Sequence, residues 1–287
     1  MSRINIINPK AGKGLAEKFV NEGEEVVYTT CIGDAERIAY EICNENENAH
    51  LTVYGGDGTI NEAVNGIIKA KYADSATLSA FPAGTGNDFL RIDKNKTVLC
   101  DVGKYNDRYF INMLNIGFDC DVVIKTQKMK KKPLISGSMA YILSVLGRFF
   151  EKFGQKMSIT LTDENGNIHS FDDEFLLCIV ANGTHYGGGF NSSPESDVTD
   201  GVLEFLFVKK ISRLKFISLI LKYKKGAHIK DGKVIKQFAD VAKYIRCKKV
   251  TIKGMEYYCA DGEIEYLNDK DTPLNINVVP GAVRFAF

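Results

Sequence analysis

Short apolar runs alternate with amphipathic stretches over the first ninety residues of the chain. Stretches of strand length, each containing three apolar residues, lie at residues 3–7, 24–30, 51–54 and 78–81. Between the last two runs, apolar residues recur at the spacing of one helix face, at Ile60, Ala63, Val64, Ile67 and Ile68. Repeated strand and helix units predict a doubly wound α/β domain with a parallel sheet.

From about residue 96 the pattern changes to strands separated by turns. Apolar runs lie at 98–102, 109–116, 157–162, 175–181, 202–208, 249–253 and 274–279. Turn signals such as Asp231-Gly232 separate many of them, which predicts a β-sandwich domain over residues 96–280. A final run at 282–287 is expected to return to the first domain, which would then comprise residues 1–95 and 281–287.

Two basic, apolar segments interrupt the β pattern, at residues 125–153 and 211–229. Helices of this kind can lie on anionic membranes. They can equally pack their apolar faces on the sandwich and leave their lysines in water, and the sequence leaves both readings open. No apolar run reaches the roughly 18 residues of a spanning helix, so we expect a soluble or peripherally bound protein.

The composition excludes several classes of protein. The 287 residues are 45% hydrophobic and carry a formal net charge of +1, which argues against disorder and against general nucleic-acid binding. Seven cysteines without a CxxC pair and four dispersed histidines fit buried thiols in a reducing cytosol better than a disulfide framework or a zinc site. We therefore expect a cytoplasmic protein.

The sequence Gly-Gly-Asp-Gly-Thr at 55–59 is the strongest candidate for chemistry. It lies between a predicted strand and a predicted helix, where glycines let backbone N–H groups approach an anion. Asp57 would repel a phosphate there unless a cation lies between them. The loop therefore predicts Mg²⁺ together with a nucleotide.

Two other loops follow predicted strands of the same domain. One is Asn8-Pro9-Lys10-Ala11-Gly12-Lys13-Gly14, and the other is the glycine-rich stretch 82–89. The first alone fits an ordinary strand-to-helix loop as well as a phosphate site. Ligands of parallel sheets bind beyond the carboxyl ends of the strands, so we expect all three loops to converge there.

Three polar loops mark the second domain: residues 182–190, Asp200-Gly201 and Asp261-Gly262-Glu263. Asp200 could bind a hard cation together with nearby carbonyl oxygens. An Asp-Gly pair before a strand is also an ordinary turn signal. The residues alone leave the two interpretations open.

Taken in order, these motifs resemble the diacylglycerol kinase catalytic family. The resemblance rests on Asn8-Pro9-x-x-Gly12, the 55–59 loop with Asn61-Glu62, the 84–89 loop, the 182–190 loop, Asp200-Gly201 and Asp261-Gly262-Glu263. The chain is most similar to the bacterial branch that includes YegS-type lipid kinases. The 55–59 motif by itself is shared with NAD kinases, whereas the ordered set is more specific.

The resemblance implies a lipid kinase that transfers the γ-phosphate of Mg-ATP to a lipid alcohol, with diacylglycerol as the first choice. ATP would bind in the cleft between the two domains. The implied nucleotide contacts are Asn8, Pro9, Lys10, Ala11, Gly12, Thr29, Gly56, Asp57, Gly58, Thr59, Ile60, Asn61, Glu62 and Thr85. Thr30 is adjacent to Thr29, and that assignment could slip by one residue.

The resemblance also implies catalytic and metal-binding residues. Glu263 corresponds to the carboxylate proposed as general base, and Asp57 is the alternative base. A structural Mg²⁺ would be held by Asp200 with the carbonyls of Asp197 and Val202.

Two other functions stay open: an NAD kinase, and a catalytically silent, membrane-associated regulator that binds a nucleotide. As partners we expect a lipid substrate at the membrane surface and peripheral membrane contact, and a homodimer stays open.

Overall fold

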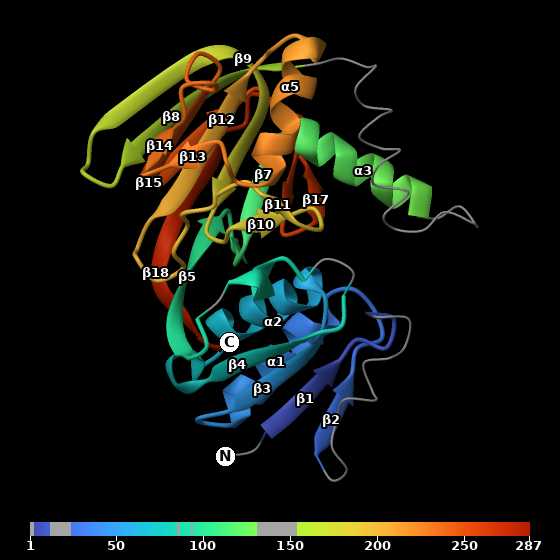
Figure 1. Cartoon of the computed structure of the whole chain (residues 1–287). Helices are drawn as coiled ribbons and strands as arrows, with labels where there is room; N and C mark the ends of the chain where they lie inside the picture. Colours follow the sequence, from blue (N-terminus) through green and yellow to red (C-terminus); the bar gives the residue numbers. More distant parts are fainter. Residues whose placement is uncertain (1–2, 12–23, 85–86, 93, 131–153) are drawn as a thin grey trace.

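The first domain is built on four parallel strands, in the order β2–β1–β3–β4. The computed structural model describes residues 3–11, 24–84, 87–92, 94–130 and 154–287 (Figure 1). The four strands are β1 (Arg3–Ile7), β2 (Glu25–Tyr28), β3 (His50–Gly55) and β4 (Thr77–Pro82). Ile6, Leu51 and Leu78 are fully buried in this sheet, as the apolar runs predict for strands in an α/β domain.

Two helices of the first domain pack closely on one another. They are α1 (Asp34–Glu45) and α2 (Asp57–Lys69). A Cβ on Gly66 would lie 2.2 Å from the Glu36 carbonyl oxygen, so glycine in the middle of α2 allows this close approach. Two short 3₁₀ turns complete the domain, η3 (Ala73–Ser75) and η4 (Phe89–Arg91).

The second domain is mainly antiparallel, as the turn-separated runs predict. Its larger strands are β5 (Thr97–Tyr105), β7 (Met113–Gly117), β8 (Gln155–Asp163), β9 (Ile168–Ala181), β12 (Leu203–Lys209), β15 (Ala242–Lys253) and β18 (Leu274–Ala286). The short strands are β6 (Arg108–Phe110), β10 (His185–Tyr186), β11 (Phe190–Asn191), β13 (Ile229–Lys230), β14 (Lys233–Val234), β16 (Tyr257–Ala260) and β17 (Glu263–Tyr266). Two helices accompany them, α3 (Phe118–Lys130) and α5 (Arg213–Lys224).

Strand β18 joins the two domains. It pairs antiparallel with β15 and β5, and its last residues pair in parallel with β4 of the first domain. In Figure 1 this red strand runs from the second domain down to the first. The pairing with β5 shifts register between Val279 and Val283, which is where Pro280 interrupts the sequence pattern.

Three elements differ from the expected pattern. The run 109–116 is broken into β6 and β7, and the hairpin of β16 and β17 was not predicted. The first basic segment starts its helix at Phe118 rather than at Lys125, while residues 131–153 lie outside the described residues.

The sandwich strands have a packed core on each face. One core is enclosed by the strands themselves, on one face of the sheet, and includes Phe175, Phe205 and Phe207. The other lies beneath α3 and α5 and includes Phe118 and Phe216. The apolar inner side of α5 therefore packs on the sandwich. Among the described residues, no helix is both long and apolar enough to cross a bilayer.

Candidate active site

Three loops meet at the carboxyl end of the first-domain sheet. The Asn8 amide of the first loop donates a hydrogen bond to the Thr59 hydroxyl at the start of α2 (3.2 Å). The loops after β3 and β4 touch through their backbones, because a Cβ on Gly84 would lie only 2.4 Å from the Gly56 Cα. The expected convergence is therefore present in the described parts of the loops.

The first loop is a turn closed by Asn8. Its carbonyl accepts the N–H of Ala11 (3.0 Å), and its side-chain oxygen accepts the N–H of Lys10 (3.0 Å). Pro9, Lys10 and Ala11 thus lie in one turn beside α2, with Lys10 exposed. Two other predicted contacts, Gly12 and Thr85, lie outside the described residues.

Thr29 lies next to this turn, since its N–H donates to the Ile7 carbonyl at the end of β1 (2.9 Å). The neighbouring Thr30 is bonded to Asp34 at the start of α1. Its hydroxyl and N–H both donate to one carboxylate oxygen of Asp34, at 2.5 and 2.8 Å. Of the two threonines, Thr29 is therefore the better candidate for a nucleotide contact.

Asp57 is held by backbone groups of the third loop. Its two carboxylate oxygens accept the N–H groups of Asp88 (3.0 Å) and Phe89 (3.1 Å). Burial raises the pKa of Asp57 above its ordinary value, while these two N–H groups lower it. Backbone dipoles thus neutralise part of the negative charge on Asp57, for which the sequence predicts a nearby Mg²⁺.

Three further predicted contacts turn their side chains into the protein. Ile60 is fully buried in the first-domain core. The Asn61 amide donates across the domain boundary to Asp261 (2.7 Å), and the Glu62 carboxylate accepts the Ala35 N–H at the start of α1 (3.1 Å). These side chains support the loop from behind, and nucleotide contacts at their positions stay predictions.

Asp261 is a buried junction between the domains. Besides Asn61, its carboxylate accepts the backbone N–H groups of Ile111 (2.8 Å), Asn112 (3.1 Å) and Met113 (2.8 Å). Burial raises the pKa of Asp261 to about 7, although the N–H donors oppose that change. Because the N–H groups of Ile111 and Asn112 lie between β6 and β7, their bonds to this carboxylate explain why the predicted strand 109–116 is broken.

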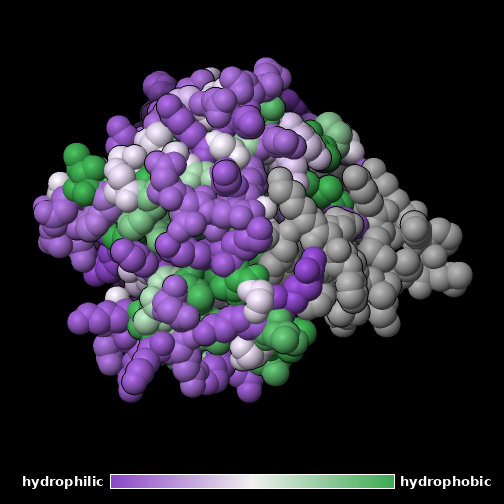
Figure 2. Space-filling model, turned by 90° about the horizontal axis from the view of Figure 1, so that it is seen from above, coloured by the Kyte–Doolittle hydropathy of each residue, from purple (hydrophilic) through white to green (hydrophobic). Residues whose placement is uncertain are grey.

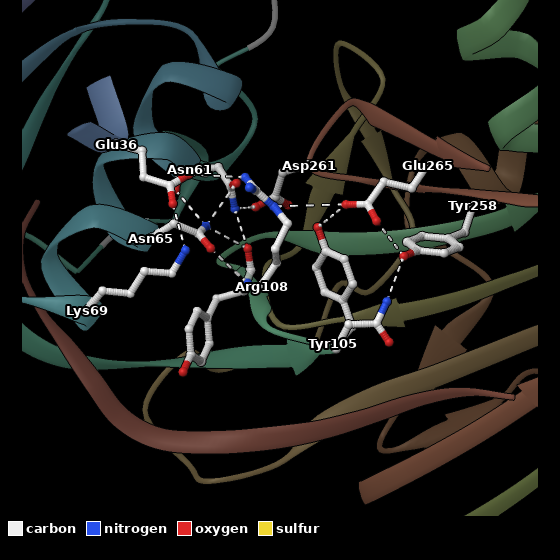
Figure 3. A network of polar contacts seen from close by, with 11 residues as sticks. Glu36, Asn61, Asn65, Lys69, Tyr105, Arg108, Tyr258, Asp261 and Glu265 are labelled. Atoms are coloured by element: carbon white, nitrogen blue, oxygen red, sulfur yellow. Dashed lines mark hydrogen bonds and ion pairs between the residues drawn. The ribbon is translucent and has the colours of Figure 1, made fainter. Parts of the chain in front are cut away.

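Strand β17 is anchored two residues beyond Glu263. The Glu265 carboxylate accepts the hydroxyls of Tyr105 (3.1 Å) and Tyr258 (2.6 Å). Arg108 lies between Glu265 and Glu36 of α1, at 3.9 and 3.4 Å. Figure 3 shows this polar network running from α1 and α2 to the β16–β17 hairpin. It fixes the hairpin against the first domain.

Glu263 faces the glycine-rich loop from the second domain. Its Oε1 lies 3.6 Å from the position that a Cβ on Gly58 would occupy. Partial burial and the nearby Glu62 raise the pKa of Glu263, while Arg108 lowers it. A partly desolvated carboxylate with a raised pKa, on a residue exposed beside an anion-binding loop, is suited to accept a proton.

A second bridge joins the domains at Asp88. Its buried carboxylate accepts the Gly188 N–H (2.7 Å) and forms an ion pair with Arg91 (3.2 Å). This contact brings the 182–190 loop to the third glycine-rich loop. The sequence motifs indicate both loops but not the bond between them.

Of the predicted ligands of a structural Mg²⁺, the Asp200 carboxylate and the Asp197 carbonyl already have partners from the chain. The Asp200 carboxylate pairs with Arg246 (2.5 Å) and accepts the Val202 N–H (3.2 Å). The Asp197 carbonyl accepts the Asp200 N–H (3.4 Å), and the Asp197 side chain pairs with Lys94 (2.6 Å). No cluster of three or more metal-binding side chains occurs in the described ranges. The structural magnesium therefore stays a prediction, and no chemical step depends on it.

No local sequence signal indicates the bridging roles of Asp261 and Asp88. The Asp-Gly pair at 261–262 was a visible turn signal, and Asp261 does adopt a positive φ of 46°. Its partner N–H groups, however, lie about 150 positions earlier in the chain. Such pairing depends on the docking of the domains and leaves no local sequence pattern.

Comparison with known proteins assigns both halves of the chain. Residues 4–101 match the diacylglycerol kinase catalytic domain, and residues 112–287 match the YegS C-terminal NAD kinase beta sandwich-like domain. Diacylglycerol kinase of Bacillus subtilis (strain 168) is 30% identical over 265 residues, which cover 82% of this chain and 83% of the relative. Diacylglycerol kinase of Staphylococcus aureus (strain NCTC 8325 / PS 47) is 31% identical over 255 residues, covering 80% and 78%.

Solved structures share the fold. A crystal structure from Bacillus anthracis str. Sterne matches with a TM-score of 0.74 at 24% identity and covers 100% of this chain and 96% of that one. Another, of a diacylglycerol kinase from the same organism, gives 0.68 at 21% identity with the same coverage. With the family matches and the two curated relatives, these findings place the chain in the diacylglycerol kinase family, whose kinases use ATP.

Proposed function

We propose that the protein transfers the γ-phosphoryl group of Mg-ATP to a hydroxyl of diacylglycerol, giving phosphatidic acid. The observation that carries this proposal is the position of Glu263, whose carboxylate faces Gly58 of the glycine-rich loop across the domain boundary. Diacylglycerol as acceptor is supported by the names of the two relatives.

The first domain supplies the donor site. Backbone N–H groups at a glycine-rich loop before a helix suit phosphate, and Asn8 and Thr59 hold the neighbouring loop against it. Phosphoryl transfer needs mainly positioning and charge neutralisation. Mg²⁺ carried with the nucleotide would supply part of that neutralisation.

The second domain supplies the base. Glu263 takes the proton from the acceptor hydroxyl while that oxygen forms a bond to the γ-phosphorus. The bond from the γ-phosphorus to the bridging oxygen breaks, and ADP leaves with the electron pair. The proton stays on Glu263 until solvent removes it.

Glu263 suits the role of base better than Asp57. Both carboxylate oxygens of Asp57 already accept backbone N–H groups, and these bonds hold the second and third loops together. Glu263 is an exposed residue at the start of β17, and its carboxylate faces the glycine-rich loop. Asp57 is therefore assigned to organising the donor site.

A phosphorylation assay with several acceptors tests the proposal. The protein is incubated with Mg²⁺, γ-labelled ATP and vesicles that contain diacylglycerol, and parallel reactions contain phosphatidylglycerol, a long-chain base or NAD. Label is expected in phosphatidic acid, identified by mass. Label in NADP would identify an NAD kinase instead, and nucleotide binding without label in any acceptor would indicate a silent regulator.

A further inference from the structure

Helix α5 has apolar side chains on two sides. Its inner side packs on the sandwich through three buried residues, Phe216, Leu219 and Tyr223. Its outer side presents Leu214, Ile217 and Leu221, which are 82%, 56% and 69% exposed. Ile220 is partly buried against the same core, so core packing accounts for four of the seven apolar residues in this helix and leaves these three outside.

The three exposed residues form one line, which we call the outer stripe. Their spacing of three and four residues places them within an arc of about 60° on a helix with 3.6 residues per turn. One exposed leucine is ordinary on a soluble protein, but a continuous apolar line indicates contact with a partner. Figure 2 views the second domain from above and shows apolar patches on a largely hydrophilic face.

Basic residues lie along both edges of the outer stripe. On the same helical projection, Arg213 and Lys224 lie within about 40° of the stripe on one side, while Lys222 and Lys215 lie about 80° and 100° from it on the other side. The helix contains no acidic residue. Lys215 reaches Asp240 at 3.4 Å, in an exposed ion pair that contributes little. An apolar line between two basic edges matches a lipid layer with anionic headgroups.

We propose that the outer stripe docks the protein on an anionic lipid bilayer, with the three apolar side chains among the acyl chains and the basic edges at the headgroups. The inference rests on the proposed lipid kinase function and identifies the surface that reaches the substrate. A second copy docked through the same face would bring lysines against lysines. A water-soluble polyanion would leave the apolar line in water.

The position of α5 links this surface to the site. Its C-terminal end reaches the 182–190 loop, where the Lys224 ammonium lies 5.3 Å from the centre of the Phe190 ring. The same loop is bonded to the third glycine-rich loop through Gly188 and Asp88. Figure 1 shows α5 along the outside of the second domain, ending near β10 and β11. Docking through α5 therefore holds the bilayer beside the loop that borders the site.

Vesicle binding measured without catalysis tests the proposal. The triple variant Leu214→Ser, Ile217→Ser, Leu221→Ser is compared with wild type by co-sedimentation with phosphatidylcholine vesicles, with and without phosphatidylglycerol. Wild type is expected to bind the anionic vesicles preferentially and less tightly at high salt. The triple variant is expected to bind them about tenfold or more weakly. The matched control is Ile168→Ser, which removes a 73% exposed residue at the turn between β8 and β9 and should bind as wild type does.

Three results would overturn the proposal. The first is a triple variant that binds anionic vesicles as tightly as wild type, and the second is a wild type that does not bind them. The third is a variant that differs from wild type only in its mass in light scattering, which would identify the stripe as a contact between copies of the chain. Phosphorylation of a monomeric short-chain diacylglycerol separates this question from the proposed function. An unchanged rate in the variant combined with lost vesicle binding supports docking, whereas a wild type that phosphorylates no lipid but still binds vesicles contradicts only the kinase proposal.

Discussion

At the residue scale, Asp261 shows how one buried carboxylate can organise a site without touching substrate. Its carboxylate accepts hydrogen bonds from one side chain and from three backbone N–H groups, and these bonds hold the turn that leads to Glu263. A buried acceptor with several donors is costly to replace, because each donor left without a partner keeps its desolvation penalty. Asp261 is thus a positioning residue for the proposed base.

Replacing Asp261 with asparagine tests this role. The new amide would turn an N–H group toward backbone N–H groups, so we expect the free energy of unfolding to fall by about 1–3 kcal/mol. Burial raises the pKa of Asp261 to about 7, against about 4 in the unfolded chain, so folding takes up a proton here. The wild type should therefore lose stability, relative to the variant, as pH rises from about 4 to 7. Denaturant unfolding at several pH values measures both effects, and a pH-independent difference would contradict the second.

At the element scale, the glycine-rich loops work because two backbones come close without side chains between them. Gly84 meets Gly56 within the protein, whereas the contact that a Cβ on Gly58 would make among the described residues is with Glu263, at an ordinary distance of 3.6 Å. In the part of the chain that the structure describes, the space beside Gly58 is therefore bordered by Glu263 rather than by another backbone. In the proposed function, the reacting groups occupy this space beside Gly58.

Alanine at Gly58 or at Gly84 tests two different roles: Gly58 borders the proposed reacting groups, and Gly84 allows the close contact between two loops. Gly58→Ala should fold as stably as wild type, or gain up to about 1 kcal/mol, because alanine favours the first turn of α2. Its turnover should fall about tenfold or more, since the methyl group displaces reactants from the base. Gly84→Ala should lose both stability and ATP affinity because the two loops must separate. Thermal unfolding and steady-state kinetics measure these effects, and a Gly58→Ala enzyme with normal turnover would place the reaction elsewhere.

The periodic elements could be predicted from the sequence, and the tertiary ones could not. The residue 3–7 stretch is β1 to the residue, because its three isoleucines are buried in the sheet, as expected for a strand of a parallel sheet. The 109–116 run also looked like one strand, yet its middle is bent by N–H groups that bond Asp261. The hairpin of β16 and β17 is short and half exposed, so it has no long apolar pattern. Local periodicity does not encode such long-range bonds.

At the scale of the whole molecule, the candidate site exists only where the two domains meet. Strand β18 pairs in both domains. The Asn61–Asp261 and Asp88–Gly188 bonds fix the second-domain loops on the glycine-rich loops. The order of the motifs indicated which loops would matter, but it carried no information on which side chain faces which. The opposition of Gly58 and Glu263 is the central result of the fold.

The most direct test is the pH dependence of turnover in the Glu263→Gln variant. Burial and Glu62 raise the pKa of Glu263, so wild-type kcat/KM should fall as pH drops through that raised pKa, when the carboxylate becomes protonated. The variant should lose about 10²- to 10⁴-fold in kcat, keep its ATP affinity and show no such acid limb. A variant with near-normal kcat and an unchanged pH profile, alongside an Asp57→Asn variant that loses the acid limb, would contradict the assignment of Glu263 as the base.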